Sequence, residues 1–197
     1  MSRHFSVFNY IRNFAFKTGV DPRVLIWPLK GSFFVLPAWV FVNDSFIEHC
    51  QVTGNSMSPT LSPQFHETGR CDQVAVWKYG ATRNISRGEI VALWAPHNPE
   101  KVTIKRVIAT EADTVYPKAG PFEKQMVPKG HIWVEGDNWR SSKDSNEYGP
   151  VSKALVIGKA VGVLWPLNRA GWLSTEWRHP RTRVVRGNPR LLKDEYD

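Results

Sequence analysis

The sequence predicts a mainly β domain that follows one membrane-spanning helix. Beyond Val52 the chain consists of short apolar or alternating runs separated by turn residues, which is typical of β-strands, and no long helical period appears. Before that part, residues 24–42 are apolar apart from Lys30, as a membrane span requires. We therefore expect a basic segment at 1–23, a transmembrane helix at 24–43, a folded domain at 44–168 and a basic, poorly ordered tail at 169–197.

The apolar segment 24–42 has the length of a membrane span. Its 19 residues would extend about 28 Å as a helix, against a hydrocarbon core of roughly 30 Å. Two prolines, Lys30 and Gly31 interrupt it. A shorter span that begins near Gly31, with Lys30 snorkelling to the interface, therefore stays open. A buried core helix or a strand is the alternative to membrane insertion.

The charges around this segment indicate its orientation. Residues 1–23 carry four basic side chains against one acid, Asp21, with serine and phenylalanine between them, which resembles a mitochondrial targeting or matrix-facing segment. Asp44 and Glu48 follow the span. By the positive-inside rule, we expect the amino terminus in the matrix and the folded domain across the membrane.

Five runs in the folded domain are predicted strands, separated by turns that contain glycine or proline. They are Val74–Trp77, Ile90–Trp94, Val102–Ile104, Arg106–Ile108 and His131–Val134. The stretch from Glu111 to Pro128 is less regular, and it is predicted to be a hairpin or a loop.

Three short motifs occur in this domain in order. They are Gly54–Thr60 (GNSMSPT), Thr103–Val107 (TIKRV), and Gly136–Asn138 (GDN) with Asp144-Ser145 downstream. Each motif alone is weak, but their order and spacing resemble the type I signal peptidase family from about residue 52 to about residue 151. The runs 130–137 and 144–151 are most similar to mitochondrial inner membrane members of that family. The resemblance implies a serine–lysine peptidase with a catalytic domain of coiled antiparallel β-sheets.

The resemblance implies that Ser56 is the nucleophile and Lys105 the base. A serine hydroxyl needs a neighbouring base, and an amine can replace histidine in that role. Lysine acts as a base only when neutral, so its usual pKa of about 10.4 must fall by several units. The apolar neighbours Ile104, Val107 and Ile108 suit that requirement, because burial disfavours the charged amine.

The same resemblance assigns supporting residues. In this family a serine of the third motif contacts the lysine amine, and counting along the motif places it at Ser142, with Ser141 as the alternative. Asp137 and Asp144 are expected to brace the loop, with Arg106 as the partner of one of them. Both aspartates also fit ordinary turn chemistry.

At two positions the chain departs from the family pattern. Asn146 stands where an arginine often follows the second aspartate, so a local salt bridge of Asp144 stays open. Gly54 stands where bacterial relatives often carry a hydroxyl that stabilises the oxyanion together with the Ser56 amide. A backbone group, a water or Thr53 would have to replace that hydroxyl.

By resemblance, a precursor protein lies extended beside residues 50–55 and 102–104, a strand-addition mode of binding in which backbone hydrogen bonds supply affinity. Small residues just before the scissile bond are favoured. The candidate substrate contacts are Thr53, Gly54, Asn55 and Ile104.

The predicted function is that of a membrane-bound serine endopeptidase that removes amino-terminal sorting peptides from precursors on the outer face of the mitochondrial inner membrane. The resemblance implies a paralogous catalytic subunit as partner, in a heterodimer, besides the precursors and the membrane lipid. Two alternatives stay open: a subunit that chiefly stabilises its partner, and a self-cleaving repressor-type protease. The membrane span and the lack of a DNA-binding domain disfavour the second.

Composition argues against two other classes. The net charge is +8, but no nucleic-acid motif is present and the basic residues gather in the two flanks, so a nucleic-acid partner is not expected. The two cysteines, Cys50 and Cys71, and six histidines show no metal-ligand spacing. No metal or cofactor is therefore expected, and the two cysteines are either a disulfide or free thiols.

Overall fold

The structure is a computed structural model, and it describes residues 35, 37–41, 45–118, 120–176 and 182–188. Contacts divide the chain into two units, Met1–Ser45 and Phe46–Asp197.

In the first unit, the described residues 35 and 37–41 are helical, and their apolar side chains are exposed. Most of the predicted transmembrane helix at 24–43, like the basic segment at 1–23, lies outside the described residues. Among the helices that the structure describes, none combines the length and the apolar character needed to cross a bilayer.

The second unit is built mainly of strands, as predicted. The strands are β1 (Ile47–Val52), β2 (Asp72–Trp77), β3 (Ile90–Ala95), β4 (Asn98–Thr110), β5 (Thr114–Tyr116), β6 (Gln125–Met126), β7 (His131–Glu135), β8 (Val151–Ser152), β9 (Val156–Trp165), β10 (Gly171–Trp172) and β11 (Arg183–Val185). The short helices are α3 (Phe65–Thr68) and α4 (Ser145–Tyr148), with 3-10 turns η1 (Lys153–Leu155) and η2 (Leu167–Arg169).

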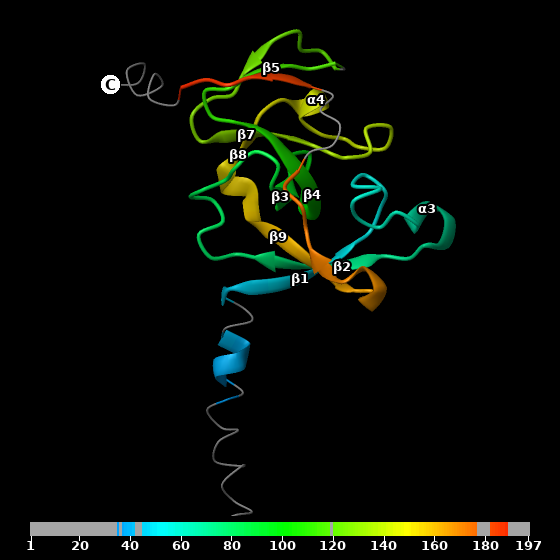
Figure 1. The fold of residues 1–197 in the computed structure, drawn as a ribbon. Helices are drawn as coiled ribbons and strands as arrows, with labels where there is room; N and C mark the ends of the chain where they lie inside the picture. The colour runs from blue at the N-terminus through cyan, green and yellow to red at the C-terminus, as the bar shows by residue number, and fades with distance from the viewer. Residues whose placement is uncertain (1–34, 36, 42–44, 119, 177–181, 189–197) are drawn as a thin grey trace, which may run out of the picture. The chain divides into compact units, whose positions relative to one another are not determined.

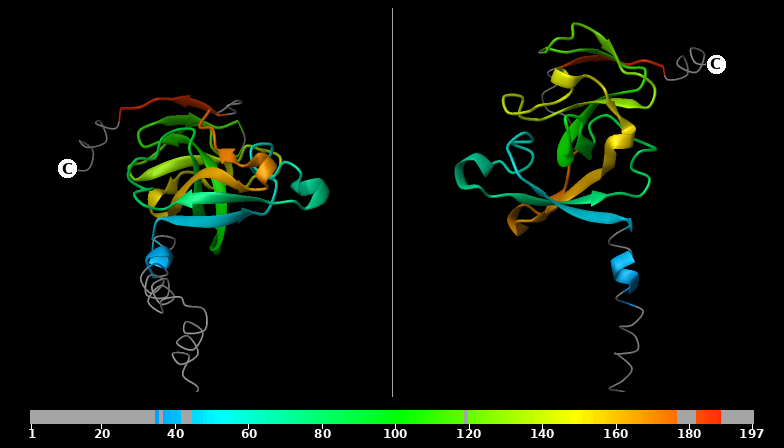
Figure 2. Two further views of the ribbon diagram at one scale, coloured as in Figure 1. Left: turned by 60° about the horizontal axis from the view of Figure 1, so that its bottom comes forward. Right: turned by 180° about the vertical axis from the view of Figure 1, so that it is seen from behind.

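These strands form two antiparallel sheets (Figures 1 and 2). The larger sheet has the order β1-β2-β9-β3-β4-β7-β8, with β10 paired to β9, and the smaller has the order β11-β5-β6. Strand β4 therefore lies inside the larger sheet, between β3 and β7.

The predicted strands 102–104 and 106–108 are one continuous strand, β4, so Lys105 lies inside a regular strand. The stretch 111–128 contains the paired strands β5 and β6. Strand β9 was not predicted, because Gly158 and Gly162 weaken its signal. Gly158 is required by packing, since a Cβ there would lie 2.5 Å from Cγ1 of Val76 on β2.

The larger sheet packs its apolar side chains beneath the first motif. Met57 is 1% exposed and lies in a core cluster with Val52, Leu61, Val74 and residues of β3, β4 and β9. The side chain of Met57 therefore holds the loop that carries Ser56 against the core.

The carboxyl-terminal segment differs from the prediction of a poorly ordered tail at 169–197. Residues 171–172 pair with β9, and Leu173 packs against the core cluster that contains Met57. Thr182 is buried, and residues 183–185 pair with β5 (Figure 1). The prediction is wrong for these residues, because sheet edges and core side chains supply partners that the basic composition does not reveal. Residues 177–181 and 189–197 lie outside the described residues.

Candidate active site

A cavity of about 510 Å³ lies where the first and second motifs meet. Ser56 and Lys105 both line it, and so do the four predicted substrate contacts, Thr53, Gly54, Asn55 and Ile104. Other lining residues come from β1, and from the turn between β3 and β4 together with the first half of β4. Ser141, Lys143 and Tyr148, near the third motif, also line the cavity. Segments far apart in the sequence thus share one concave surface.

Lys105 projects from β4 and is only 3% exposed. Its Nζ donates a hydrogen bond to Ser142 Oγ at 3.0 Å, and Ser142 Oγ donates to Asp144 Oδ2 at 2.7 Å. Ser141 Oγ instead accepts a hydrogen bond from Asn55 Nδ2 at 3.2 Å. Of the two serines that the sequence left open, Ser142 is therefore the one beside the lysine.

The environment of Lys105 favours its neutral form. Burial lowers the pKa of the Lys105 amine from 10.5 to about 8, because a charged amine loses hydration there. The positive charge of Lys101 lowers this pKa further, whereas Asp144, Asp137 and Glu147 raise it. Burial is the largest of these effects, so the site holds a lysine that is partly deprotonated near neutral pH.

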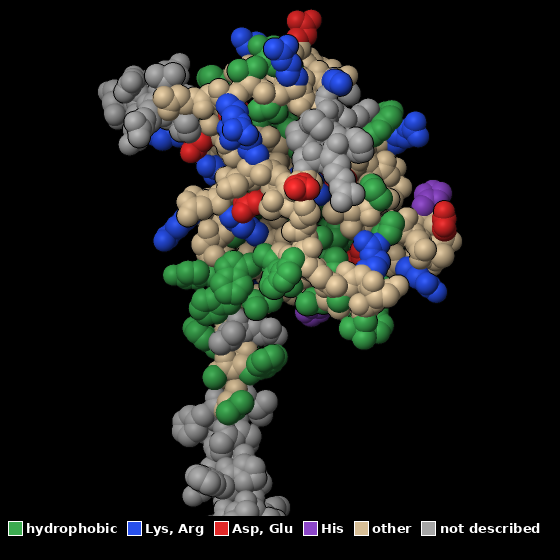
Figure 3. Space-filling view, in the orientation of Figure 1, with side chains coloured by type: hydrophobic (Ala, Val, Ile, Leu, Met, Phe, Trp, Pro, Cys, Tyr) green, Lys and Arg blue, Asp and Glu red, His purple; other side chains and the backbone are tan. Residues whose placement is uncertain are grey.

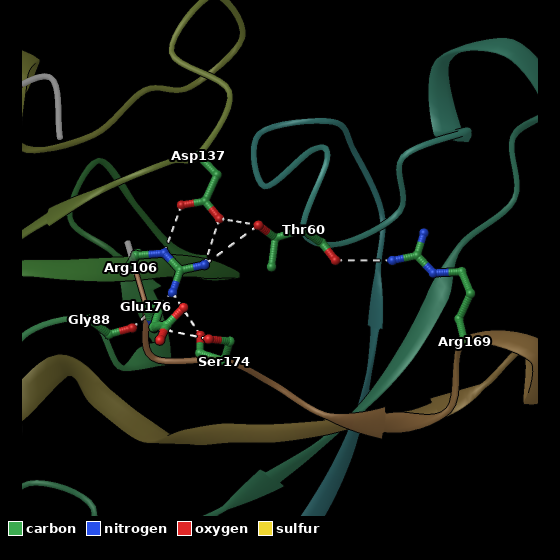
Figure 4. A network of polar contacts seen from close by, with 7 residues as sticks. All are labelled: Thr60, Gly88, Arg106, Asp137, Arg169, Ser174 and Glu176. Atoms are coloured by element: carbon green, nitrogen blue, oxygen red, sulfur yellow. Dashed lines mark hydrogen bonds and ion pairs between the residues drawn. The ribbon is translucent and has the colours of Figure 1, made fainter. Parts of the chain in front are cut away.

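Arg106, the next residue of β4, holds the third motif (Figure 4). Its Nε and Nη2 donate to the two oxygens of Asp137 at 2.8 and 2.7 Å, and its Nη1 donates to the carbonyls of Gly88 and Ser174 at 2.9 and 3.1 Å. Thr60 Oγ1 donates to Asp137 at 2.5 Å. Arg106 is 3% exposed, so this bidentate pair is a fixed element of the site.

Asp144 is held by neutral donors, whereas Asp137 has an arginine. Oδ2 of Asp144 accepts from the Gly136 amide at 3.0 Å as well as from Ser142, and Oδ1 accepts from the amide and the side chain of Asn146 at 3.2 and 2.9 Å. Asn146 thus supplies contacts at the position where the family pattern often has arginine. The local salt bridge that stayed open in the sequence is not required to hold this carboxylate.

The third motif also contacts the loop that carries Ser56 directly. The Asn138 amide donates to the Ser56 carbonyl at 2.9 Å. Gly136 lies between Ser56 and Ser142, and a Cβ on Gly136 would meet Ser142 and would lie 2.6 Å from the Ser56 carbonyl oxygen. Within the described residues, the Ser56 amide and hydroxyl make no hydrogen bond. In unbound active sites the hydrogen bond between a nucleophile and its base is often long or poorly aligned, and it tightens when substrate binds.

Two hydrogen bonds to Glu135 could not be predicted from the sequence. Glu135 is buried beside the third motif, where it accepts hydrogen bonds from Trp133 Nε1 at 2.9 Å and from Thr182 Oγ1. Burial raises the pKa of the Glu135 carboxyl.

Cys50, which lines the cavity, and Cys71 are free thiols. Among the residues that the structure describes, no cluster of His, Cys, Asp or Glu could hold a metal ion.

Comparison with known proteins agrees with the three motifs. Residues 27–122 and 117–165 match the family described as signal peptidase, peptidase S26. The chain belongs to this family. The family resemblance inferred from the three motifs is therefore confirmed.

Several similar proteins carry one name, mitochondrial inner membrane protease subunit 2. The Saccharomyces cerevisiae protein is 44% identical over 79% of this chain and 89% of its own length. The Danio rerio protein is 35% identical over 92% of this chain and 98% of its own length. A solved signal peptidase I from Enterococcus faecalis aligns with 39% of this chain and 97% of its own at 23% identity and a TM-score of 0.35. Family membership supports a peptidase function for this chain.

Proposed function

We propose that the chain is a serine endopeptidase that works by a Ser56–Lys105 dyad. The observation that carries this proposal is a buried lysine, held by Ser142, in the same cavity as Ser56. An exposed lysine would be protonated at neutral pH and could not accept a proton. Burial that lowers the pKa of Lys105 to about 8 reduces this obstacle, because part of the amine is then neutral near pH 7.

In the proposed reaction, the neutral Lys105 amine takes the proton of Ser56 Oγ as that oxygen attacks the scissile carbonyl. The hydrogen bond to Ser142 uses one N–H of the amine and leaves its lone pair free for Ser56. The Ser56 amide donates to the developing oxyanion. Protonated Lys105 then gives its proton to the leaving amine. A water that the neutral amine deprotonates attacks the acyl-enzyme, and Lys105 returns that proton to Ser56 Oγ as the ester bond breaks.

Cleavage should increase with pH through about 8. The active form of Lys105 is neutral, so the fraction of active enzyme increases as pH passes its pKa of about 8 from below. The measurement is kcat/KM for a precursor peptide as a function of pH, because this ratio reports the free enzyme. A midpoint near the ordinary lysine value of 10.5 would contradict the proposed environment of the base.

The proposed substrates are precursor proteins delivered to the mitochondrial intermembrane space, cut after their amino-terminal sorting peptides. The names of the similar proteins support this proposal, since they are mitochondrial inner membrane proteases. The cavity lies between residues 50–55 and 102–105, as expected for a precursor that binds as an extended strand. Thr53, Gly54, Asn55 and Ile104 are the proposed contacts along that path.

We also propose that the chain is anchored in the inner membrane by a helix at 24–43, with the catalytic unit facing the intermembrane space. Val35, Trp39, Val40 and Phe41 are all more than half exposed, as lipid-facing side chains would be. Within the second unit, Trp77 and Tyr79 are exposed, and their rings lie beside that of Phe46, which directly precedes β1. Figure 3 shows hydrophobic side chains gathered on the lower part of this unit, where Figure 1 places the start of β1. Amphipathic aromatic rings favour a membrane–water interface.

The names of similar proteins also support a heteromeric complex, because they are called subunits of a protease. The alternative function is therefore a subunit that mainly stabilises a catalytic partner. Cells that lack this chain and express Ser56→Ala separate the two. We expect Ser56→Ala to restore the abundance of the partner but to leave the precursors of this chain uncut, as judged from their amino termini. Full maturation in those cells would favour the stabilising role.

A further inference from the structure

The charged side chains that line the cavity are all basic. They are Lys101, Lys105 and Lys143, and no described aspartate or glutamate lines it. Lys101 and Lys143 are exposed and form no ion pair with another described residue. Lys153 and Lys159, which do not line the cavity, each pair with a glutamate. The cavity thus has two positive charges, besides the base, that no described group neutralises.

Strand geometry places Lys101 relative to the base. Lys101 and Lys105 are both on β4, four residues apart, and both line the cavity, although the pairing with β3 shifts register between Val102 and Asn98. At a rise of about 3.3 Å per residue, their Cα atoms are separated by at most about 13 Å. The side chain of a residue roughly four positions from the reacting carbonyl of an extended chain lies at that distance.

We propose that this basic lining selects precursors that carry an acidic residue about four positions before the scissile bond, where Lys101 binds the carboxylate and Lys143 adds to the attraction. The inference rests on the proposed function, because it takes the precursor to lie beside residues 102–104 with its reacting carbonyl at Ser56. Lys101 is thereby a specificity-determining residue. Its role differs from that of Lys105, which exchanges a proton with the reacting atoms.

The size of the effect follows from the exposure of the two lysines. An exposed ion pair changes binding by about 2- to 5-fold, and a cleft lined by one sign of charge adds long-range attraction that salt screens. The charge of Lys101 also acts on the base, because it lowers the pKa of Lys105. Removal of that charge should therefore raise the pKa of Lys105, while the effects of Asp144, Asp137 and Glu147 on this pKa stay the same.

The test compares two peptides that differ at one residue. Both have alanine before the scissile bond, and the fourth residue before that bond is either aspartate or asparagine. For the full chain we expect kcat/KM to be about 3- to 10-fold higher for the aspartate peptide at low salt, and less different at high salt. Lys101→Gln should remove most of this preference, and Lys101→Gln with Lys143→Gln should remove all of it.

The ratio between the two peptides distinguishes charge recognition from a structural role, since a loss of folded protein lowers both rates equally. Lys124→Gln is the matched control, because Lys124 is exposed and does not line the cavity. It should keep the preference of the unsubstituted chain. Equal cleavage of both peptides by the unsubstituted chain would overturn the inference, and so would an equal loss on both peptides in Lys101→Gln. An upward shift of the pH midpoint in Lys101→Gln supports it independently.

A binding measurement tests the charge recognition separately from the proposed function. Fluorescence anisotropy of labelled peptides with Ser56→Ala protein measures the preference without any cleavage. If the aspartate peptide binds more tightly but the unsubstituted chain cuts neither peptide, the charge recognition stands and the proposed function fails. If the unsubstituted chain cuts both peptides equally and Ser56→Ala cuts neither, the proposed function stands and the charge recognition fails.

Discussion

Lys105→Arg is expected to abolish cleavage while the protein stays folded. Arginine keeps the positive charge and much of the length of lysine, but it does not lose its proton near neutral pH and cannot act as a base. Loss of a nucleophile or its base typically lowers kcat by about 10⁴- to 10⁶-fold. The measurement is kcat of the purified variant on a precursor peptide, with thermal unfolding as the check on folding.

Two comparisons sharpen this prediction. Lys124→Arg makes the same chemical change at an exposed position outside the cavity and should leave kcat within about 2-fold, as surface substitutions usually do. Ser56→Ala combined with Lys105→Ala should be no less active than either single variant, because the nucleophile and base act as one unit. Substantial cleavage by Lys105→Arg would rule out Lys105 as the base.

Gly136→Ala is expected to lower kcat by about 100-fold or more, since a displacement of about 1 Å in a catalytic group can have that effect. The added Cβ would overlap Ser142 and would lie 2.6 Å from the Ser56 carbonyl oxygen. One methyl group therefore crowds both Ser142, which contacts Lys105, and the loop that carries Ser56. The backbone of Gly136 does not require a left-handed conformation, so the cause is crowding rather than strain.

Gly171→Ala is the matched control for this crowding. Gly171 also lacks a left-handed backbone, and a Cβ there would meet nothing within 4 Å. Its kcat and its thermal midpoint should stay near those of the unsubstituted chain. If Gly136→Ala were folded and fully active, the close contact among Gly136, Ser142 and Ser56 would not position the dyad.

The sequence was sufficient to identify the two residues of the proposed dyad. Ser56 and Lys105 were identified from motifs in order, and the mainly β class from short apolar runs between turn residues, such as Ile90–Trp94. Both signals are local, because the pattern within a motif or a strand depends on a few neighbouring residues. Strand β9 escaped notice for the same reason, since Gly158 is explained only by a strand distant in sequence, β2.

The tertiary structure decided which groups contact the residues of the proposed dyad. Whether Ser141 or Ser142 contacts Lys105, and whether Asp137 or Asp144 pairs with Arg106, depends on where the loop after β7 lies against β4. The sequence leaves such choices open, because neighbouring loop residues point in different directions. Sheet register and loop conformation remove the ambiguity by fixing donor and acceptor to within a few tenths of an ångström.

The sequence by itself thus determined the family, the strand-rich class and the two residues of the proposed dyad, because each is written in short contiguous patterns. Only the tertiary structure revealed that the described part of the carboxyl-terminal segment belongs to the strand-rich second unit, with the Ser174 carbonyl on Arg106 and the Thr182 hydroxyl on Glu135. Its composition predicts a solvated tail. Its partners are a buried guanidinium and a buried carboxyl that adjoin the site, and such long-range pairing is a property of the folded chain.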